Sequence, residues 1–324
     1  PFHNGHAYQI AEAKRITGAD YAVVVMSGDF VQRGTPAIWD KYTRTRAALL
    51  GGADLVFELP VIYATASAEY FAEGGVALLT ALGVDAICFG SECGDISLLQ
   101  EIATILSNES EEYSATLKRF LSQGFSYPNA RNWALVQHNP HLNEHQKVFS
   151  SPNNILGIEY CKALLARNSS IAPFTVKRTG GEYHSRGRDQ QLCSALAIRH
   201  ALLEGCDIAQ VSTHMPKEAA EILTNYMTDY PGLTANDFSS LLYYKLLSEQ
   251  EKGYEEYWDV SSDISDRIRK HLFEFKDYDS FCGLLKTKEV TYTRISRCLL
   301  HILLNITKAD MELGKSLDYV PYAR

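Results

Sequence analysis

The sequence lacks the features of disulfide-rich, membrane-spanning or strongly basic proteins. Its seven cysteines are odd in number, scattered, and form no Cys-x-x-Cys pair, which is typical of reduced thiols in a cytoplasm. No apolar run approaches the roughly 18–20 residues that a bilayer-spanning helix needs, and no signal peptide is visible. The net charge of −8 argues against a protein covered in nucleic acid, although it is compatible with a local basic face.

What the chain does contain is the composition of an ordinary globular protein. Its 324 residues are long enough for two domains, with 46% hydrophobic and 22% charged residues. It opens on "PFHNGHAYQI", with no initiator Met and no strand before the His-Asn-Gly-His box. Because this box resembles the turn between a first strand and a first helix, we expect further sequence upstream of Pro1.

The first 205 residues alternate between helical and strand patterns. Strands are predicted at residues 21–26, 54–59, 85–90 and 171–178, and helices at 6–17, 38–51, 67–82, 97–123, from 152 onward and at 191–204. Residues 124–151 are expected to be rich in loops. Successive helix–strand units predict an α/β fold with a doubly wound parallel sheet. Beyond Gly205 only helical patterns follow, to residue 308, which predicts a domain boundary near 205–215.

The opening box has the residue types that a phosphate site requires. A strand-to-helix turn presents free backbone N–H groups and the positive end of a helix dipole. Gly5 allows close approach of the backbone, and the imidazoles of His3 and His6 can donate to phosphate oxygens while pyrophosphate departs. The alternative is an incidental helix start.

The box is similar to the HxGH signature of the nucleotidyltransferase and class I aminoacyl-tRNA synthetase superfamily. That superfamily has a second, Ser-rich signature that ends in Ile-Arg, and "SALAIRHAL" at 194–202 occupies the corresponding place. There Ser194 would cap a helix and Arg199 would neutralise a phosphate. Leu196 stands where a hydroxyl residue is common. The alternative is an amphipathic helix with an exposed arginine.

Longer motifs resemble the bacterial tRNA(Met) cytidine acetate ligase family: "VVVMSGDFVQRGTPAIWDKYTRTRAALLGGADLVFELP", "FGSE" (89–92), "SPNNILGIEY" (151–160) and "VKRTGGEYHS" (176–185). The resemblance implies a Rossmann-like fold of the HUP type. It also implies an ATP-binding catalytic domain at 1–210 and an all-helical tRNA-interacting domain at 211–324.

The implied reaction is an ATP-dependent ligation in the cytoplasm. Acetate is activated as acetyl-adenylate, and the acetyl group passes to N4 of the wobble cytidine of elongator tRNA(Met). ATP is the expected substrate, with Mg²⁺ accompanying it, and neither DNA nor a membrane is an expected partner. The competing hypotheses are a nucleotidyltransferase that adenylates a small phosphorylated substrate without RNA, and a non-catalytic nucleotide-binding module.

The resemblance also implies the site residues. His3 and His6 are the expected catalytic residues, and the expected ATP contacts are Pro1, Phe2, His3, Asn4, Gly5, His6, Gly90, Asn154, Arg178, Ser194 and Arg199. The sequence around Asn154 also reads as a helix start, so helix capping is the alternative role for this residue. Lys41, Arg44 and Arg46 follow a loop near the end of a strand and are interpreted as a solvated helix face, with contact to phosphate or RNA as the alternative.

A basic segment near the end of the chain is the best candidate for RNA contact. Residues 286–308 have a formal charge of +4, and the expected tRNA contacts are Lys286, Lys288, Arg294 and Arg297. An apolar stripe predicts a helix here, with His301 expected beside Arg294 and Arg297 on a neighbouring face. Tyr292 could stack on a base. The alternative is a core helix with a solvated basic edge.

One histidine-rich stretch suggests a metal site. His138, His141 and His145 lie close together in the sequence, but no thiolate accompanies them. We therefore expect no protein-bound metal.

Overall fold

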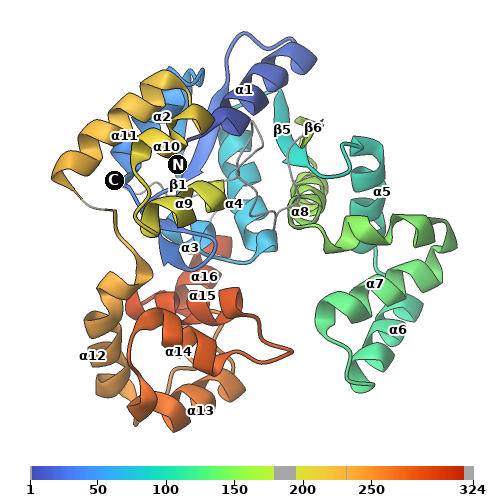
Figure 1. Ribbon diagram of the computed structural model, residues 1–324. Helices are drawn as coiled ribbons and strands as arrows, with labels where there is room; N and C mark the ends of the chain where they lie inside the picture. Colours follow the sequence, from blue (N-terminus) through green and yellow to red (C-terminus); the bar gives the residue numbers. More distant parts are fainter. Residues whose placement is uncertain (1, 179–194, 231, 317–324) are drawn as a thin grey trace. The chain divides into compact units, whose positions relative to one another are not determined.

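The computed structural model describes residues 2–178, 195–230 and 232–316, and the chain divides into two compact units (Figure 1). Unit 1 comprises residues 1–67, 179–286 and 292–324, and unit 2 comprises residues 68–178 and 287–291. Each unit is therefore assembled from segments that are separated in the sequence. This division by contacts does not follow a single boundary, so the assignment of roles to residues 1–210 and 211–324 stays a prediction.

The strands of unit 1 are β1 (Val23–Ser27), β2 (Phe30–Val31), β3 (Thr35–Pro36) and β4 (Leu55–Leu59). β1 and β4 pair in parallel, with Val25 opposite Phe57. The β-branched run of β1 favours a strand because such side chains pack well on a pleated surface. β2 and β3 form a short antiparallel hairpin that follows directly on β1.

The helices of unit 1 surround these strands and continue into a helical region. They are α1 (Asn4–Thr17), α2 (Lys41–Leu50), α3 (Val61–Ala64), α9 (Ala195–Leu203), α10 (Ile208–Val211), α11 (Lys217–Asp229), α12 (Ser239–Glu249), α13 (Ser262–His271), α14 (Tyr278–Leu285), α15 (Tyr292–Leu303) and α16 (Lys308–Ser316), with 3-10 turns η2 (Ser212–His214), η3 (Ala235–Phe238) and η4 (Leu272–Glu274). α2 packs against α11, and α15 packs against α12 and α14. Figure 1 shows α12 to α16, in orange to red, gathered into one group.

Unit 2 is built around the parallel pair β5 (Ala86–Ser91) and β6 (Ala172–Lys177), in which Gly90 lies opposite Val176. Its helices are α4 (Ala68–Ala81), α5 (Ile96–Ser107), α6 (Glu111–Ser122), α7 (Tyr127–His138) and α8 (Pro152–Ala166), with the 3-10 segment η1 (Pro140–Ser150). α8 packs against α4 and α5. A Cβ on Gly157 would lie 2.7 Å from the Phe89 ring, so glycine allows α8 to approach β5 closely.

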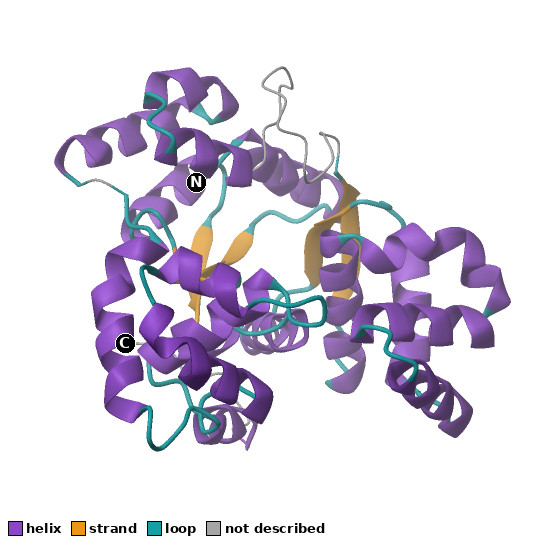
Figure 2. Ribbon diagram, turned by 60° about the horizontal axis from the view of Figure 1, so that its bottom comes forward, coloured by secondary structure: helices purple, strands orange, loops and turns teal. Residues whose placement is uncertain are grey.

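The predicted α/β class and parallel pairing are confirmed, and the predictions for residues 97–123 and 124–151 are wrong. In the described residues the parallel strands form two separate hydrogen-bonded pairs (Figure 2). The segment 124–151 is helical, in α7 and η1, because buried Ala130, Ala134 and Leu135 give α7 an inward face that its polar residues mask in the sequence. The helix predicted at 97–123 is two helices, since the Ser110 side chain accepts from the Tyr113 amide and starts α6 afresh. Within the described residues, no helix combines the length and the apolarity needed to cross a membrane.

Candidate active site

The opening box forms a reciprocal cap at the start of α1. His3 is the N-cap residue, and its Nδ1 accepts a hydrogen bond of 3.0 Å from the Gly5 amide. In return the His3 amide donates to His6 Nδ1 over 3.4 Å. Two backbone N–H groups of the first turn are thus satisfied by imidazoles, in the positions where a Ser and a Glu usually serve.

This cap fixes which ring nitrogen carries the proton. Because Nδ1 of His3 and of His6 both accept from backbone amides, the proton of each neutral ring resides on Nε2. The rings are stacked, with centroids 3.9 Å apart and planes 22° apart. His3 is buried, at 6% exposure, whereas His6 is exposed. The start of α1 therefore carries two adjacent Nε2–H donors, which suit an anionic oxygen.

Two glycines and Phe2 stabilise the position of this cap. A Cβ on Gly5 would lie 2.7 Å from His3 Cε1, so only glycine leaves room for the capping ring. Phe2 is buried among small side chains that include Ala47 and Ala48 of α2. A Cβ on Gly51 would meet the Phe2 ring at 2.1 Å. Phe2 therefore anchors the turn on α2 by packing.

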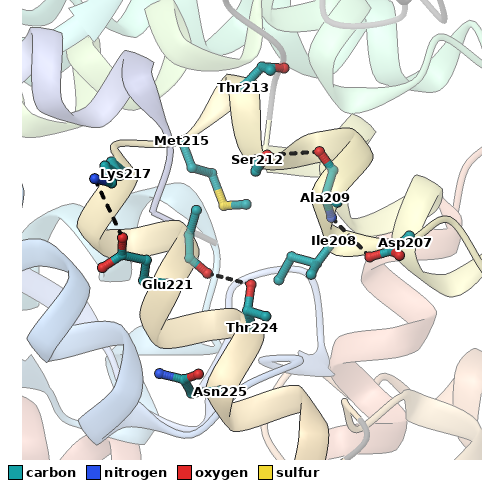
Figure 3. A pocket seen from close by; sticks show the side chains of 11 residues that line it. Asp207, Ile208, Ala209, Ser212, Thr213, Met215, Lys217, Glu221, Thr224 and Asn225 are labelled. Atoms are coloured by element: carbon teal, nitrogen blue, oxygen red, sulfur yellow. Dashed lines mark hydrogen bonds and ion pairs between the residues drawn. The ribbon is translucent and has the colours of Figure 1, made fainter.

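Asn4 connects the start of α1 to the segment that follows α10. Its Nδ2 donates a hydrogen bond of 3.1 Å to the Thr213 carbonyl. Thr213 lines a cavity of about 720 Å³ over α10, η2 and α11 (Figure 3). Most polar side chains that line the cavity form hydrogen bonds within their own helices. Asp207 caps α10, and the Thr224 hydroxyl donates to the Ala220 carbonyl of α11.

Arg44 is not part of a solvated helix face, and this interpretation of the sequence is wrong for it. Its guanidinium is partly buried and donates to the backbone carbonyls of Trp39 and Ser27, each over 3.0 Å, and to that of Gly28. Burial lowers the pKa of Arg44. The side chain thus fixes the chain where it leaves β1. Arg46 is exposed, as the interpretation requires.

Arg199 of α9 lies within electrostatic reach of two further arginines. Burial first, and then the positive charges of Arg33 and Arg44, lower the pKa of Arg199 to about 10. The Nε of Arg199 is buried and has no hydrogen-bond partner within the described part of the chain. A buried guanidinium beside two further positive charges is stabilised by a bound polyanion. The sequence motif predicted Arg199, but nothing in the sequence marked Arg33 or Arg44 as partly buried.

Lys41, the first residue of α2, forms an ion pair of its own. Its Nζ forms an ion pair with Glu58 of β4 over 2.7 Å. The Glu58 carboxylate in turn occupies the space next to Gly28, where a Cβ would lie 2.0 Å from Oε1. Lys41 is therefore engaged in holding the ends of β1 and β4 rather than freely presented to solvent.

In unit 2 the structure brings together three of the residues predicted to contact ATP. Gly90 lies near the end of β5, and the carbonyl of the next residue, Ser91, accepts from the Arg178 amide over 2.9 Å. Asn154, at the start of α8, accepts from the amides of Glu92 and Cys93 over 2.9 and 3.0 Å. Asn154 therefore binds the loop after β5 and does not cap its own helix, so the capping alternative is wrong.

The predicted tRNA residues differ in how they are held. Lys286 and Lys288 are exposed, whereas Arg297 is partly buried and ion-paired with Asp259 over 3.0 Å. His301 does not project beside Arg294 and Arg297: it is completely buried, and its Nδ1 lies 3.0 Å from the Trp258 carbonyl. The amphipathic pattern misplaced His301 because its ring is polar yet bonded within the core.

Other predicted residues lie elsewhere or outside the described part. The Tyr292 hydroxyl donates to Asp279 over 2.7 Å. His138 contacts the Thr116 hydroxyl at 2.9 Å, and His141 contacts Glu101 at 2.6 Å, so these two histidines have different partners. Pro1 and Ser194 lie outside the described residues.

Comparisons with known proteins bear on the whole chain. It matches the HIGH Nucleotidyl Transferase family over residues 1–324. The tRNA(Met) cytidine acetate ligase of Acetivibrio thermocellus is 41% identical over 332 residues, which cover 100% of this chain and 79% of that protein. The ligase of the same name from Caldicellulosiruptor saccharolyticus is 41% identical over 322 residues, which cover 99% of this chain and 78% of that protein.

Solved structures agree with these relatives. Thermotoga maritima TmcAL bound with alpha-thio ATP is 34% identical, with a TM-score of 0.89 over 98% of this chain and 75% of that chain. The apo form is 34% identical, with a TM-score of 0.92 over 98% and 76% of the two chains. With a family match along its full length, relatives above 40% identity and the same fold, the chain belongs to the HIGH nucleotidyl transferase family and, within it, to the tRNA(Met) cytidine acetate ligases.

Proposed function

We propose that this chain activates acetate with ATP and transfers the acetyl group to elongator tRNA(Met). In the first step an acetate oxygen attacks the α-phosphorus of ATP. The bond from that phosphorus to the pyrophosphate oxygen breaks, which gives acetyl-adenylate and pyrophosphate. In the second step the N4 amine of the wobble cytidine, C34, attacks the acetyl carbonyl carbon, AMP leaves with the electron pair, and the nitrogen loses a proton. The products are N4-acetylcytidine and AMP.

The paired imidazoles at the start of α1 are the observation that carries this proposal. Their Nδ1 atoms are occupied by backbone amides, so their Nε2–H groups can donate to phosphate oxygens at the helix N-terminus. Donors fixed in this way stabilise the charge that develops on the α-phosphate without reorganisation during the reaction. We assign this role to His3 and His6.

The arginines of unit 1 suit the other end of the triphosphate. Arg199, with Arg33 and Arg44 in electrostatic reach, would neutralise the departing pyrophosphate. In unit 2, we assign Gly90, Arg178 and the Nδ2 of Asn154 as contacts of the nucleotide. For tRNA we assign the exposed Lys286 and Lys288, together with Arg294 and Arg297.

Mg²⁺ would enter this reaction with ATP. The described residues hold no group of three or more His, Cys, Asp or Glu side chains that could bind a metal ion. Magnesium ions usually keep several waters and bind through the phosphate oxygens of a nucleotide. Bound there, Mg²⁺ would neutralise charge on the leaving pyrophosphate. We place the reaction in the cytoplasm.

The assay of the complete reaction uses ATP, radiolabelled acetate and unmodified elongator tRNA(Met). Label is expected in the tRNA, together with one AMP per acetyl group. Adenylation of a small phosphorylated compound without label in RNA would instead support the alternative nucleotidyltransferase, which the names of the relatives do not favour.

A His3→Asn variant tests the role of the imidazole separately from its role as a cap. Asparagine is among the best N-cap residues, so α1 should keep its start while the Nε2–H is lost. We expect acetate-dependent pyrophosphate exchange to fall about 10²–10³-fold, the usual cost of removing one such donor. Exchange within threefold of the wild-type rate in the folded variant would remove His3 from the chemistry.

A further inference from the structure

The loop that follows β5 and the start of α8 are joined by hydrogen bonds in both directions. From the loop, Glu92 extends its carboxylate to the first turn of α8. From that turn, the Asn154 side chain reaches back to the loop amides. All of these groups belong to unit 2. We call this set of contacts between Glu92, Asn153 and Asn154 the Glu92 latch.

Glu92 completes the start of α8, which its own residues leave open. The first helical residue is Pro152, which has no N–H, and the N-cap residue Ser151 makes no side-chain capping bond. The Asn153 amide donates to Glu92 Oε1 over 3.2 Å, and the Asn154 amide donates to Oε2 over 2.8 Å. The Asn153 Nδ2 adds a bond of 2.8 Å to Oε1. Both carboxylate oxygens are therefore used at the positive end of the helix.

The return contacts fix the loop to the helix. The Asn154 Oδ1 accepts from the amides of Glu92 and Cys93, and Asn154 is only 2% exposed. The next amide, that of Gly94, donates to the Ser91 hydroxyl over 3.0 Å. Consecutive amides of the loop thus have fixed partners, so the position of the loop depends on Asn154 and, through the carboxylate, on Glu92.

The same loop leads to residues that we assign to the nucleotide. Ser91 follows Gly90 directly, and its carbonyl accepts from the Arg178 amide over 2.9 Å. We propose that Glu92 is a positioning residue for ATP, which holds the strand end with Gly90 and the amide of Asn154 in the geometry that the nucleotide requires. This inference rests on the proposed function, because it takes the nucleotide contacts from there.

A plain helix cap and a positioning residue predict different defects. Loss of a cap lowers the stability of unit 2 and the fraction of active protein, but the remaining active molecules bind ATP normally. Loss of a positioning contact weakens ATP binding in protein that is fully folded. Loss of a positioning contact should therefore change the KM for ATP and the equilibrium affinity for an ATP analogue. Loss of a cap should change the apparent kcat alone.

The test uses the full chain with Glu92→Gln, in which one carboxylate oxygen that accepts from an amide becomes an NH₂ group that faces it. Glu101→Gln is the matched control. Glu101 lies on α5 of the same unit, its side chain is 46% exposed, and its ion-pair partner is His141. We expect Glu92→Gln to raise the dissociation constant of alpha-thio ATP and the KM for ATP about tenfold, with kcat within twofold, and Glu101→Gln to leave both unchanged. Glu92→Asp, which keeps one carboxylate, should give an intermediate affinity.

The Asn154→Ala variant tests the other partner in the Glu92 latch. Glu92 and Asn154 act through the same contacts. The dissociation constant of alpha-thio ATP for the Glu92→Gln/Asn154→Ala double variant should therefore be at most twofold higher than that of the single variant with the lower affinity. Full additivity, or an affinity of folded Glu92→Gln within twofold of wild type, would overturn the inference and leave the proposed function intact. Wild-type protein that binds the analogue but exchanges no pyrophosphate with acetate would overturn the proposed function and leave the latch intact.

Discussion

The Ser296 hydroxyl donates a hydrogen bond of 2.8 Å to the carbonyl oxygen of Gly34. The Tyr278 hydroxyl lies 3.0 Å from the same carbonyl, and all three groups are buried in unit 1. Gly34 lies in the turn between β2 and β3, directly after Arg33. α14 and α15 therefore support the hairpin that carries one of the clustered arginines, which gives the helical region a role in shaping the proposed phosphate site.

Gly34→Ala should be strongly destabilising, because two separate constraints require glycine. The residue has φ of 78°, and a Cβ would lie 2.3 Å from the Arg297 amide nitrogen. Positive φ alone costs about 1–2 kcal/mol, and the backbone clash adds to it, so we expect the free energy of unfolding to fall by more than about 2 kcal/mol. Urea titration measures this change.

Gly18→Ala is the matched control for that measurement. Gly18 has φ of 69° at the end of α1, but apart from its chain neighbours no atom of the described residues lies within 4 Å of its Cβ position. Only the strain should remain, at about 1 kcal/mol. Equal losses at the two positions would contradict close packing of the hairpin on α15.

Arg44→Lys tests whether the planar guanidinium holds the end of β1. A lysine ammonium cannot reach the Trp39, Ser27 and Gly28 carbonyls together, so acceptors are left without donors. We expect a loss of about 1–3 kcal/mol in the free energy of unfolding. Arg46→Lys, on the exposed face of the same helix, should change it by less than about 0.5 kcal/mol. If both variants unfold at the same urea concentration, Arg44 has no such role.

The sequence predicted the elements near the site better than the contacts that hold it. Strands β1, β4, β5 and β6 follow from short runs rich in apolar and β-branched residues, which pack well on a pleated surface. The start of α1 followed from its motif. α7 was missed because its inward face consists of small residues such as Ala130 and Ala134, which give a weak periodic signal.

Contacts between distant residues account for what the sequence could not predict. Arg44 resembled a surface residue until the carbonyls of Ser27 and Gly28 were seen around it. His301 was expected on a basic face because its partners, Trp258 and Thr65, are far away in the sequence. Glu92 could have been found from one signal: α8 begins with a proline after a serine, and "FGSE" offers a carboxylate at the end of β5.

The buried His301 should make stability depend on pH. Burial lowers the pKa of His301 from its ordinary value of 6.5, with the positive Arg297 acting in the same direction and Asp259 opposing it. The unfolded chain therefore binds a proton more readily, and stability is lost as the pH falls below about 6.5 toward the pKa of the folded state. The slope from this one group cannot exceed about 1.4 kcal/mol per pH unit.

Denaturant titrations of wild type and His301→Gln between pH 7.5 and 5.5 measure this contribution. Glutamine does not titrate, so the variant should lose less stability on acidification, whatever its constant cost at neutral pH. Parallel pH dependences for the two proteins would show that His301 keeps its ordinary pKa in the folded chain.

Lys286 and Arg297 are expected to affect tRNA binding in different ways. Lys286 is exposed, so Lys286→Ala should weaken binding without loss of stability and lower the salt dependence, d log K/d log[salt], by about 1. Arg297 holds Asp259 over 3.0 Å, with side-chain exposures of 15% and 20%, so Arg297→Ala leaves a largely buried carboxylate unpaired. Its free energy of unfolding should fall by about 1–3 kcal/mol, and tRNA affinity must be measured on the folded fraction. An unchanged salt slope for Lys286→Ala would remove Lys286 from the RNA contact, and an unchanged unfolding energy for Arg297→Ala would contradict the structural role of its ion pair with Asp259.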